Sequence, residues 1–316
     1  MISTDLTRLL GIRHPVLLAP MDGTAGGELA AAVSDGGGLG MIGGGYADPD
    51  WLRREIALAG EARVGIGFIA FALDERPDTL QLALDADPVA IQLSFGDPRP
   101  HARRIKDHGT LLICQVQSDE EIDRALEAGA DVLIAQGQDG GGHGRGQRAT
   151  MGLVPSMVDR VAPLPVAAAG GIADGRGLAA AITLGAGGVS LGTRFLASPE
   201  AISTPAEAAA ILEGRSIDTV RTSAVDVIRG PRWPDGLDGR ILRNRLTESW
   251  NGTDDDEATR RLYAESEPDD RTIRETWAGE GLDLITSLEP AAAMVEAIAA
   301  EAARALGFAH ATLTDR

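Results

Sequence analysis

Between Pro15 and Leu196, short apolar runs alternate regularly with longer amphipathic segments. This rhythm is typical of βα units whose strands form a parallel sheet. The apolar runs predict eight strands: Val16–Ala19, Leu39–Ile42, Val64–Ile69, Val89–Leu93, Leu111–Val116, Val132–Ala135, Val166–Ala168 and Gly188–Leu191. Because the runs are continuously apolar, both faces of each strand are expected to be covered. Eight such strands predict an α/β fold with a closed (β/α)8 TIM barrel rather than an open, doubly wound sheet.

The segments between the strands carry the helix signals. Predicted helices span Gly27–Ser34, Pro49–Ala59, Thr79–Ala83, Arg99–His108, Asp119–Ala128, Val154–Val161 and Gly175–Leu184. Ser118 precedes Glu121 by three residues, which is the spacing of a capping box, and Gly129 supplies a stop signal. The helix between them therefore has both of its ends marked in the sequence.

After Leu196 the rhythm changes. Residues 198–288 have few apolar runs and contain the turn-forming string Gly230–Gly239, whereas Pro290–Leu306 is an alanine-rich amphipathic segment. We therefore predict a barrel formed by residues 1–197 and 289–316. Residues 198–288 are expected to form a smaller, mainly helical lobe or lid, inserted before the last barrel helix.

Charge and rare residues exclude several function classes. The formal charge is -18, so the average field repels nucleic acid and anionic membrane surfaces. Cys114 is the only cysteine, which excludes an intramolecular disulfide and a multi-cysteine metal site. Its position inside a predicted strand suggests an inert, buried thiol. Lys106 is the only lysine and lies in a polar helical segment, so Schiff-base chemistry is not expected.

Targeting signals are not evident. Met1–His14 has no continuous apolar core of the signal-peptide type, and no stretch has the length and composition of a membrane span. We therefore expect a cytoplasmic protein that binds neither membranes nor nucleic acid. The sequence does not determine the assembly, and a homodimer stays open.

Glycines follow the last two predicted strands. Gly170 and Gly171 come after the seventh strand, and Gly192 and Thr193 follow the eighth. In barrels of this kind these two loops form the usual phosphate site, because backbone N–H groups next to glycine can approach an anion closely. The two loops together predict a phosphate cradle, although each glycine pair alone could simply make a tight turn.

His143 follows the sixth strand in a loop with glycines at 140–142 and at 144. A histidine flanked by glycines has no apolar face to pack against, so a structural core role is disfavoured. Its near-neutral intrinsic pKa suits removal of a proton from a weak carbon acid. No second histidine lies at metal-ligand spacing, so no metal site is predicted.

Gln115 and Gln136 lie near the ends of the fifth and sixth strands. Their amides could bond the edge of a planar ring at the barrel mouth, or could pair with each other inside the barrel.

At these residues the chain resembles the nitronate monooxygenase (2-nitropropane dioxygenase-like) family. The matching strings are AlaProMet at 19–21, AlaGlnGly at 135–137, GlyGlyHis at 141–143, AlaGlyGlyIleAlaAspGly at 169–175 and GlyThrArgPhe at 192–195, with ArgThrSer at 221–223 and AlaGlyGlu at 278–280 further along. The resemblance implies FMN, with its phosphate at Gly171, Gly192 and Thr193 and with His143 as the catalytic base. The residues expected around FMN are Ala19, Pro20, Met21, Gly67, Gln115, Gln136, Gly141, Gly142, Gly170, Gly171, Leu191, Gly192 and Thr193.

The chain also departs from the family pattern. Members often have an asparagine after the third strand, whereas this chain has Gly67 in GlyIleGlyPhe at 65–68, and Ser94 stands where a histidine is common. The tyrosines and the lysine that line some family active sites have no obvious counterpart here. These departures concern the substrate more than the flavin fold.

The expected reaction is FMN-dependent oxidation of alkyl nitronates or nitroalkanes by O2, giving a carbonyl compound and nitrite. An FMN- and NAD(P)H-dependent enoyl-thioester reductase is the main alternative. A flavin- or phosphate-binding protein without turnover is a third interpretation, and a metal-dependent barrel hydrolase is a distant fourth.

Overall fold

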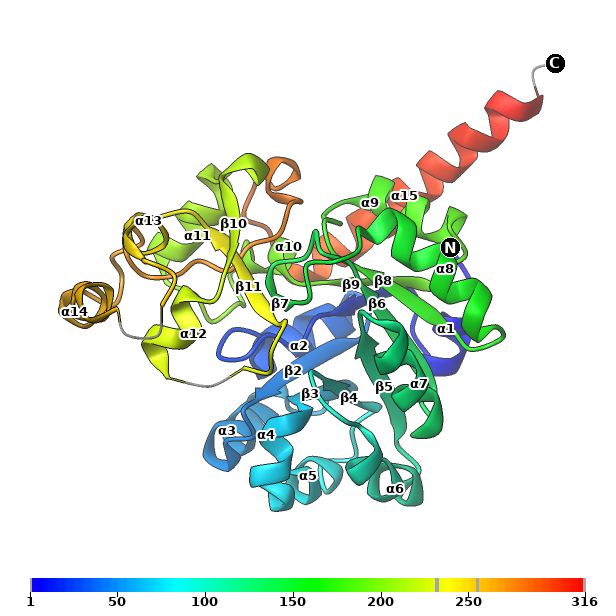
Figure 1. The fold of residues 1–316 in the computed structure, drawn as a ribbon. Helices are drawn as coiled ribbons and strands as arrows, with labels where there is room; N and C mark the ends of the chain where they lie inside the picture. The colour runs from blue at the N-terminus through cyan, green and yellow to red at the C-terminus, as the bar shows by residue number, and fades with distance from the viewer. Residues whose placement is uncertain (1, 231–232, 254–255, 315–316) are drawn as a thin grey trace.

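The computed structural model describes residues 2–230, 233–253 and 256–314. Eight parallel strands form one sheet in the order β1-β9-β8-β6-β5-β4-β3-β2. These strands are β1 (Val16–Leu18), β2 (Gly40–Gly45), β3 (Val64–Ile69), β4 (Ala90–Ser94), β5 (Leu111–Val116), β6 (Val132–Gln136), β8 (Val166–Ala169) and β9 (Gly188–Leu191). A parallel bridge between Leu17 and Leu39 joins β1 to β2. The sheet therefore closes on itself, and the predicted TIM barrel is confirmed (Figure 1).

Helices cover the outside of the barrel (Figure 1). They are α2 (Gly27–Asp35), α3 (Pro49–Ala59), α4 (Ala70–Glu75), α5 (Pro77–Leu84), α6 (Arg99–His108), α7 (Asp119–Glu127), α8 (Thr150–Val161), α9 (Gly175–Thr183) and α15 (Ala291–Thr314), with α1 (Asp5–Leu10) preceding β1. The capping box of Ser118 and Glu121 forms as predicted. Helix α8 begins at Thr150, earlier than predicted, because the Thr150 N–H donates to the distant Asp139 carboxylate at 2.7 Å.

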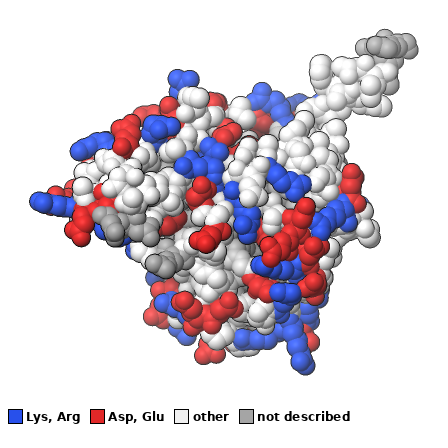
Figure 2. All heavy atoms as spheres, in the orientation of Figure 1, with Lys and Arg blue, Asp and Glu red and all other residues white. Residues whose placement is uncertain are grey.

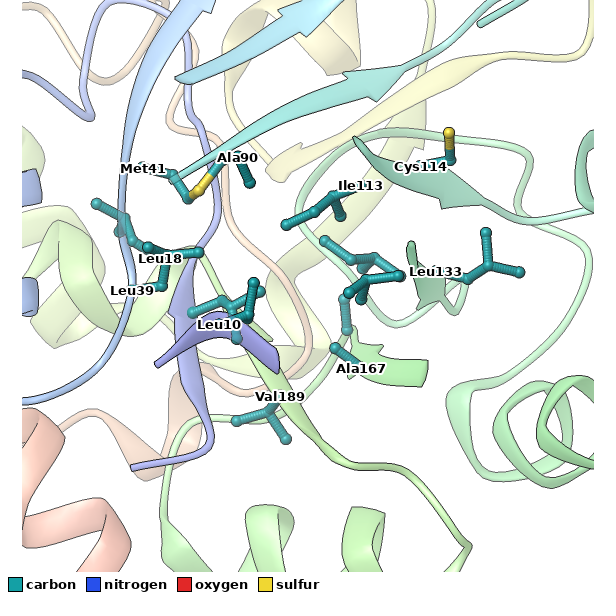
Figure 3. Close-up of a cluster of buried hydrophobic side chains, with 14 of the residues drawn as sticks. Leu10, Leu18, Leu39, Met41, Ala90, Ile113, Cys114, Leu133, Ala167 and Val189 are labelled. Carbon is teal, nitrogen blue, oxygen red and sulfur yellow. The ribbon is translucent and has the colours of Figure 1, made fainter. Parts of the chain in front are cut away.

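The barrel interior is filled by side chains from different strands. Met41, Ala90, Ile113 and Val189 come from β2, β4, β5 and β9 and are fully buried (Figure 3). Cys114 is buried too, and burial raises the pKa of its thiol to about 12, so the thiol stays protonated at neutral pH. The inert thiol expected from the sequence is what this environment produces.

Residues after β9 build a lobe against the carboxyl ends of the strands (Figure 1). The short helix α10 (Thr193–Leu196) leads out of the barrel. The helices of the lobe are α11 (Pro205–Glu213), α12 (Ala224–Arg229), α13 (Arg245–Ser249) and α14 (Glu257–Glu265), with short 3-10 helices at Ser216–Asp218 and Leu282–Leu284. The lobe also contains a sheet in the order β10-β11-β7, formed by β10 (Thr219–Thr222), β11 (Asp238–Leu242) and β7 (Gly142–Gly144). Strand β7 belongs to the glycine-rich loop of the barrel, so the two parts share a sheet.

The hydrophobic cores follow the same division. Met294 and Ile298 of α15 join the barrel core, whereas Val225, Ile241 and Leu246 form a separate cluster in the lobe. A third cluster joins the two parts, since it contains Ala197 as well as Ile211. The division into a barrel of residues 1–197 and 289–316 and a lobe of residues 198–288 stays a proposal. Acidic and basic side chains are interspersed over the face of both parts shown in Figure 2. Among the described residues, no helix is long and apolar enough to cross a lipid bilayer.

Candidate active site

A cavity of about 370 Å³ lies at the carboxyl ends of the barrel strands, beneath the lobe. Loops after β1, β6, β8 and β9 line it from the barrel, and α11, α12 and the 276–277 segment line it from the lobe. This volume falls within the range of small-molecule and cofactor sites, roughly 300–1,000 Å³. The carboxyl end of the strands is also where barrels of this type place their active sites.

One wall of the cavity is built for an anion. Gly170 and Gly171 have φ angles of 108° and 69°, which L side chains rarely adopt, and this turns the loop after β8 along the cavity. Within the described residues, no group accepts a hydrogen bond from the backbone N–H of Gly171, Ile172, Gly192 or Thr193. A Cβ added to Gly170 would lie 2.8 Å from the Thr150 hydroxyl oxygen. Free N–H groups on a concave glycine surface fit a phosphate.

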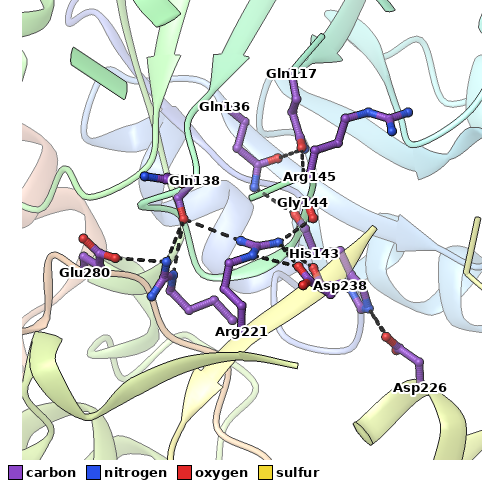
Figure 4. A network of polar contacts seen from close by, with 11 residues as sticks. Gln117, Gln136, Gln138, His143, Gly144, Arg145, Arg221, Asp226, Asp238 and Glu280 are labelled. Carbon is purple, nitrogen blue, oxygen red and sulfur yellow. Dashed lines mark hydrogen bonds and ion pairs between the residues drawn. The ribbon is translucent and has the colours of Figure 1, made fainter. Parts of the chain in front are cut away.

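An amide network lies next to this wall. Gln136 Oε1 accepts hydrogen bonds from Gln115 Nε2 at 2.5 Å and from Gln117 Nε2 at 2.7 Å. Gln136 Nε2 donates to the backbone carbonyl of His143 at 3.0 Å (Figure 4). The structure therefore pairs the two predicted glutamines with each other and also brings both to the cavity wall. The two interpretations left open by the sequence are compatible.

The glycine-rich loop is held by the lobe. Strand β7 pairs with β11 in antiparallel fashion, with His143 opposite Gly239. Arg240 donates to the Gln138 carbonyl at 3.2 Å and pairs with Glu280 at 2.9 Å. Arg221 also donates to this carbonyl and contacts the Gly144 carbonyl and the Asp238 carboxylate (Figure 4). Two lobe arginines thus fix the backbone on both sides of His143.

The His143 imidazole lines the cavity and is almost completely enclosed. Its Nε2 lies 2.9 and 3.0 Å from the two carboxylate oxygens of Asp226 on α12 (Figure 4). Its ring stacks on the Trp233 indole, with ring centroids 3.5 Å apart and an angle of 4° between the planes. The Trp277 ring lies 4.9 Å away at 38°. One carboxylate and two indoles therefore surround the predicted base.

The lobe contributes the residues that the sequence analysis missed. Asp226, Trp233 and Trp277 all line the cavity, as does Tyr46 from the loop after β2. Trp233 Nε1 donates to the Tyr46 hydroxyl at 3.0 Å. The chain has only four tryptophans, and two of them lie here, so their scarcity was the available signal. No such signal marked Asp226 in the sequence, because acidic residues are abundant throughout the lobe.

Asp22 and Tyr46 add ionisable groups to the same cavity. The Asp22 side chain keeps access to solvent, but the cavity walls displace much of its water and so raise the pKa of its carboxyl. Burial likewise raises the pKa of the Tyr46 phenol. Arg229 lines the cavity as well, and its positive charge opposes the rise in the Asp22 pKa. Both groups therefore keep their protons to higher pH than in water.

Most of the residues predicted to surround a cofactor do line this cavity. They are Ala19, Pro20, Met21, Gln115, Gln136, Gly141, Gly142, Gly170, Gly171, Gly192 and Thr193. Gly67 and Leu191 do not. Leu191 is buried in the barrel core, and Gly67 lies beneath Pro20, whose Cγ would be 2.3 Å from a Cβ at that position. The proline ring fills the space that a side chain at residue 67 would need.

Gly67→Ala is expected to destabilise the protein by about 1–3 kcal/mol, because the added Cβ overpacks against a rigid proline ring. The matched control is Gly152→Ala on α8, where no atom lies within 4 Å of the added Cβ. That change should stabilise the helix by about 0.5–1 kcal/mol. Thermal and urea unfolding of the two variants measure both effects. Equal stability of Gly67→Ala and the wild type would show that the Pro20 ring moves aside at no measurable cost in free energy.

Comparison with known proteins finds relatives that match most of this chain. The family model described as nitronate monooxygenase matches residues 3–65 and 70–301. The nitronate monooxygenase of Pseudomonas aeruginosa is 32% identical over 93% of this chain and 98% of its own length. The (3aS,4S,5R,7aS)-5-hydroxy-7a-methyl-1-oxo-octahydro-1H-indene-4-carboxyl-CoA dehydrogenase of Mycobacterium tuberculosis is 34% identical over 78% of this chain and 68% of its own.

A solved structure confirms the fold over nearly the whole chain. FabK from Thermotoga maritima superposes with a TM-score of 0.87 and 32% sequence identity, covering 99% of this chain and 100% of the other. The family match includes the barrel loops and the whole lobe, residues 198–288, that encloses His143. The chain therefore belongs to the nitronate monooxygenase family of flavin-dependent oxidoreductases.

Proposed function

We propose that this chain uses FMN to oxidise alkyl nitronates and nitroalkanes with O2, giving a carbonyl compound and nitrite, with His143 as the catalytic base. The observation that carries the proposal is the position of His143, whose imidazole lines the same cavity as the free N–H groups of the phosphate-type loops. A ring nitrogen and an anion cradle in one cavity suit a base that works next to a phosphate-bearing cofactor.

The residues present fit FMN. The N–H groups of Gly171, Ile172, Gly192 and Thr193 would hold its phosphate, since they have no acceptor within the described chain. Met21, Gln115, Gln136 and Gly141 line the cavity and would contact the ring. When bound, FMN supplies the two-electron redox chemistry, which no side chain that lines this cavity provides.

His143 acts on the neutral form of the substrate. A nitroalkane carries a weakly acidic C–H next to the nitro group, and a base within hydrogen-bond reach can remove that proton. A nitronate has already lost this α-proton, so its oxidation needs no base. The indoles of Trp233 and Trp277 cover the imidazole and exclude water from it.

The second candidate is an FMN- and NAD(P)H-dependent enoyl-thioester reductase. One comparison favours it, because a 34% identical relative is named a carboxyl-CoA dehydrogenase, and a carboxyl-CoA is a thioester. The same cavity would then hold a thioester instead of a nitro compound. His143 would act on that substrate as a proton donor or acceptor.

Two measurements on the purified protein test the proposal. The first is the visible absorption spectrum together with mass analysis of any flavin released on denaturation, where FMN is expected. The second consists of two assays: O2 consumption and nitrite release are measured with ethylnitronate or nitroethane as the substrate, and reduction of the flavin by NADH is measured without O2. Nitrite release supports nitronate oxidation. Reduction of the flavin by NADH, followed by turnover of an enoyl-thioester, would instead support the second candidate and overturn the first. A colourless protein that releases no flavin would overturn both.

A further inference from the structure

Asp226 is a buried carboxylate with a single side-chain partner in the part of the chain that is described. Its side chain is 9% exposed, and that of His143 is 12% exposed. Both Asp226 oxygens lie within 3.0 Å of His143 Nε2, and no other described donor bonds this carboxylate. Burying a carboxylate is unfavourable unless a donor compensates it. The burial of Asp226 is therefore explained by its contact with His143.

We propose that Asp226 is a positioning residue that holds His143 with its hydrogen on Nε2, so that Nδ1 is the atom that takes the substrate proton. This inference rests on the proposed function. An ionised carboxylate can only accept a hydrogen bond, so the nitrogen facing it must carry the hydrogen. In a neutral imidazole the lone pair then lies on Nδ1. When the α C–H bond of a nitroalkane breaks, the proton goes to Nδ1 and the electron pair stays in the nitronate.

The lobe also sets the plane of the ring. Trp233 is stacked nearly parallel to the imidazole, and Trp277 lies near it at a centroid distance of 4.9 Å. The backbone of His143 is paired with β11, and its carbonyl accepts from Gln136. The hydrogen bond to Asp226 determines which ring nitrogen carries the hydrogen, and stacking on Trp233 limits rotation of the imidazole. Together they fix the orientation of Nδ1 relative to the backbone. Apart from Gln136, these contacts come from the lobe.

Other ionisable groups share the cavity, and the experiment must separate them from Asp226. Tyr46, Asp22 and Arg229 all line it. The Tyr46 phenol senses the negative charge of both Asp226 and Asp22, and the positive charge of Arg229. Only Asp226 bonds the His143 ring directly among the described side chains. A role that operates through His143 is therefore specific to Asp226.

Kinetics with paired substrates test the role in proton transfer. In Asp226→Ala, kcat for neutral nitroethane should fall by about 10²–10³-fold, a large part of the usual contribution of a general base. Turnover of preformed ethylnitronate and the flavin content should change less than about twofold, because neither needs the base. The kcat of Asp226→Asn for nitroethane should lie between those of Asp226→Ala and the wild type, because asparagine keeps the shape of the side chain but not its charge. Asp235→Asn, in an exposed turn of the lobe, is the matched charge control and should behave like the wild type.

A double-variant cycle shows whether Asp226 acts through His143. In a His143→Ala background, Asp226→Ala should cause no further loss of nitroethane turnover, because residues that act as one unit are not additive. An equal loss in both backgrounds would assign Asp226 a structural role. Equal losses with nitroethane and ethylnitronate would lead to the same conclusion.

The tautomer itself can be observed without turnover. The chain has five histidines, so 15N-histidine labelling with a His143→Ala reference spectrum identifies the His143 nitrogens. At a pH where the ring is neutral, the wild type should show a protonated Nε2 and an unprotonated Nδ1. A protonated Nδ1 would overturn the inference. This result is independent of whether nitronates prove to be the substrate, so failure of the inference and failure of the proposed function are distinguishable.

Discussion

His143→Ala is expected to lower kcat for neutral nitroalkanes by about 10²–10⁴-fold, the usual contribution of a general base. Flavin binding should be retained, because the imidazole bonds Asp226 of the lobe, whereas the N–H groups that would hold the phosphate belong to the loops after β8 and β9. Turnover of preformed nitronates should fall much less, since these substrates carry no α-proton that must be removed. The measurement is the ratio of the two kcat values, together with the flavin-to-protein absorbance ratio.

The alanine variant also removes the stacking partner of Trp233, so a second variant is needed. His143→Gln keeps a planar polar group that can donate to Asp226 but cannot act as a base near neutral pH. It should lose nitroalkane turnover to a similar extent. Undiminished turnover in either variant would remove His143 from the reaction. Loss of flavin in both would mean that the loop serves cofactor binding instead.

The second large effect is expected at Gly192. Its φ of -107° suits any residue, and an added Cβ would lie 3.4 Å from the Met21 sulfur, an ordinary contact. Gly192→Asp would place a negative charge beside the proposed phosphate, and like charges in contact cost several kcal/mol. The affinity for FMN should therefore fall at least about 100-fold, since each factor of ten corresponds to about 1.4 kcal/mol. Fluorescence titration of the apoprotein measures the change.

Gly192→Asn is the matched control, because it has the same size without the charge. It should bind FMN much more tightly than the aspartate variant. The affinities of the two variants for riboflavin, which lacks the phosphate, should be nearly equal. If asparagine and aspartate weaken FMN binding equally, the effect is steric and the phosphate lies elsewhere.

The loops that end β6, β8 and β9 show why part of the cavity could be predicted. Their glycines and His143 stand directly after apolar strands in the sequence, and barrel geometry brings the carboxyl ends of all strands to one edge. Gly67 shows the limit of this reasoning. It lies in a strand at the same end of the barrel, but the ring of Pro20 covers it, and that contact joins residues 47 positions apart.

The short strand β7 shows a different limit. Gly142–Gly144 has no intrinsic preference for a strand, and it becomes one only because β11 offers it a partner almost a hundred residues later. The same pairing fixes His143 opposite Gly239, in the lobe that also provides Asp226. No local pattern in the sequence encodes this contact, because it depends on how the lobe docks on the barrel.

The barrel, the glycine loops and the identity of the histidine at the cavity could all be predicted from the sequence. These features depend on local signals: continuous apolar runs, turn-forming glycines and a capping box. The partners of His143, the contact between Pro20 and Gly67, and the sheet shared by barrel and lobe became visible in the folded chain alone. Each of these depends on contacts between residues far apart in the chain, which local propensity and periodicity do not describe.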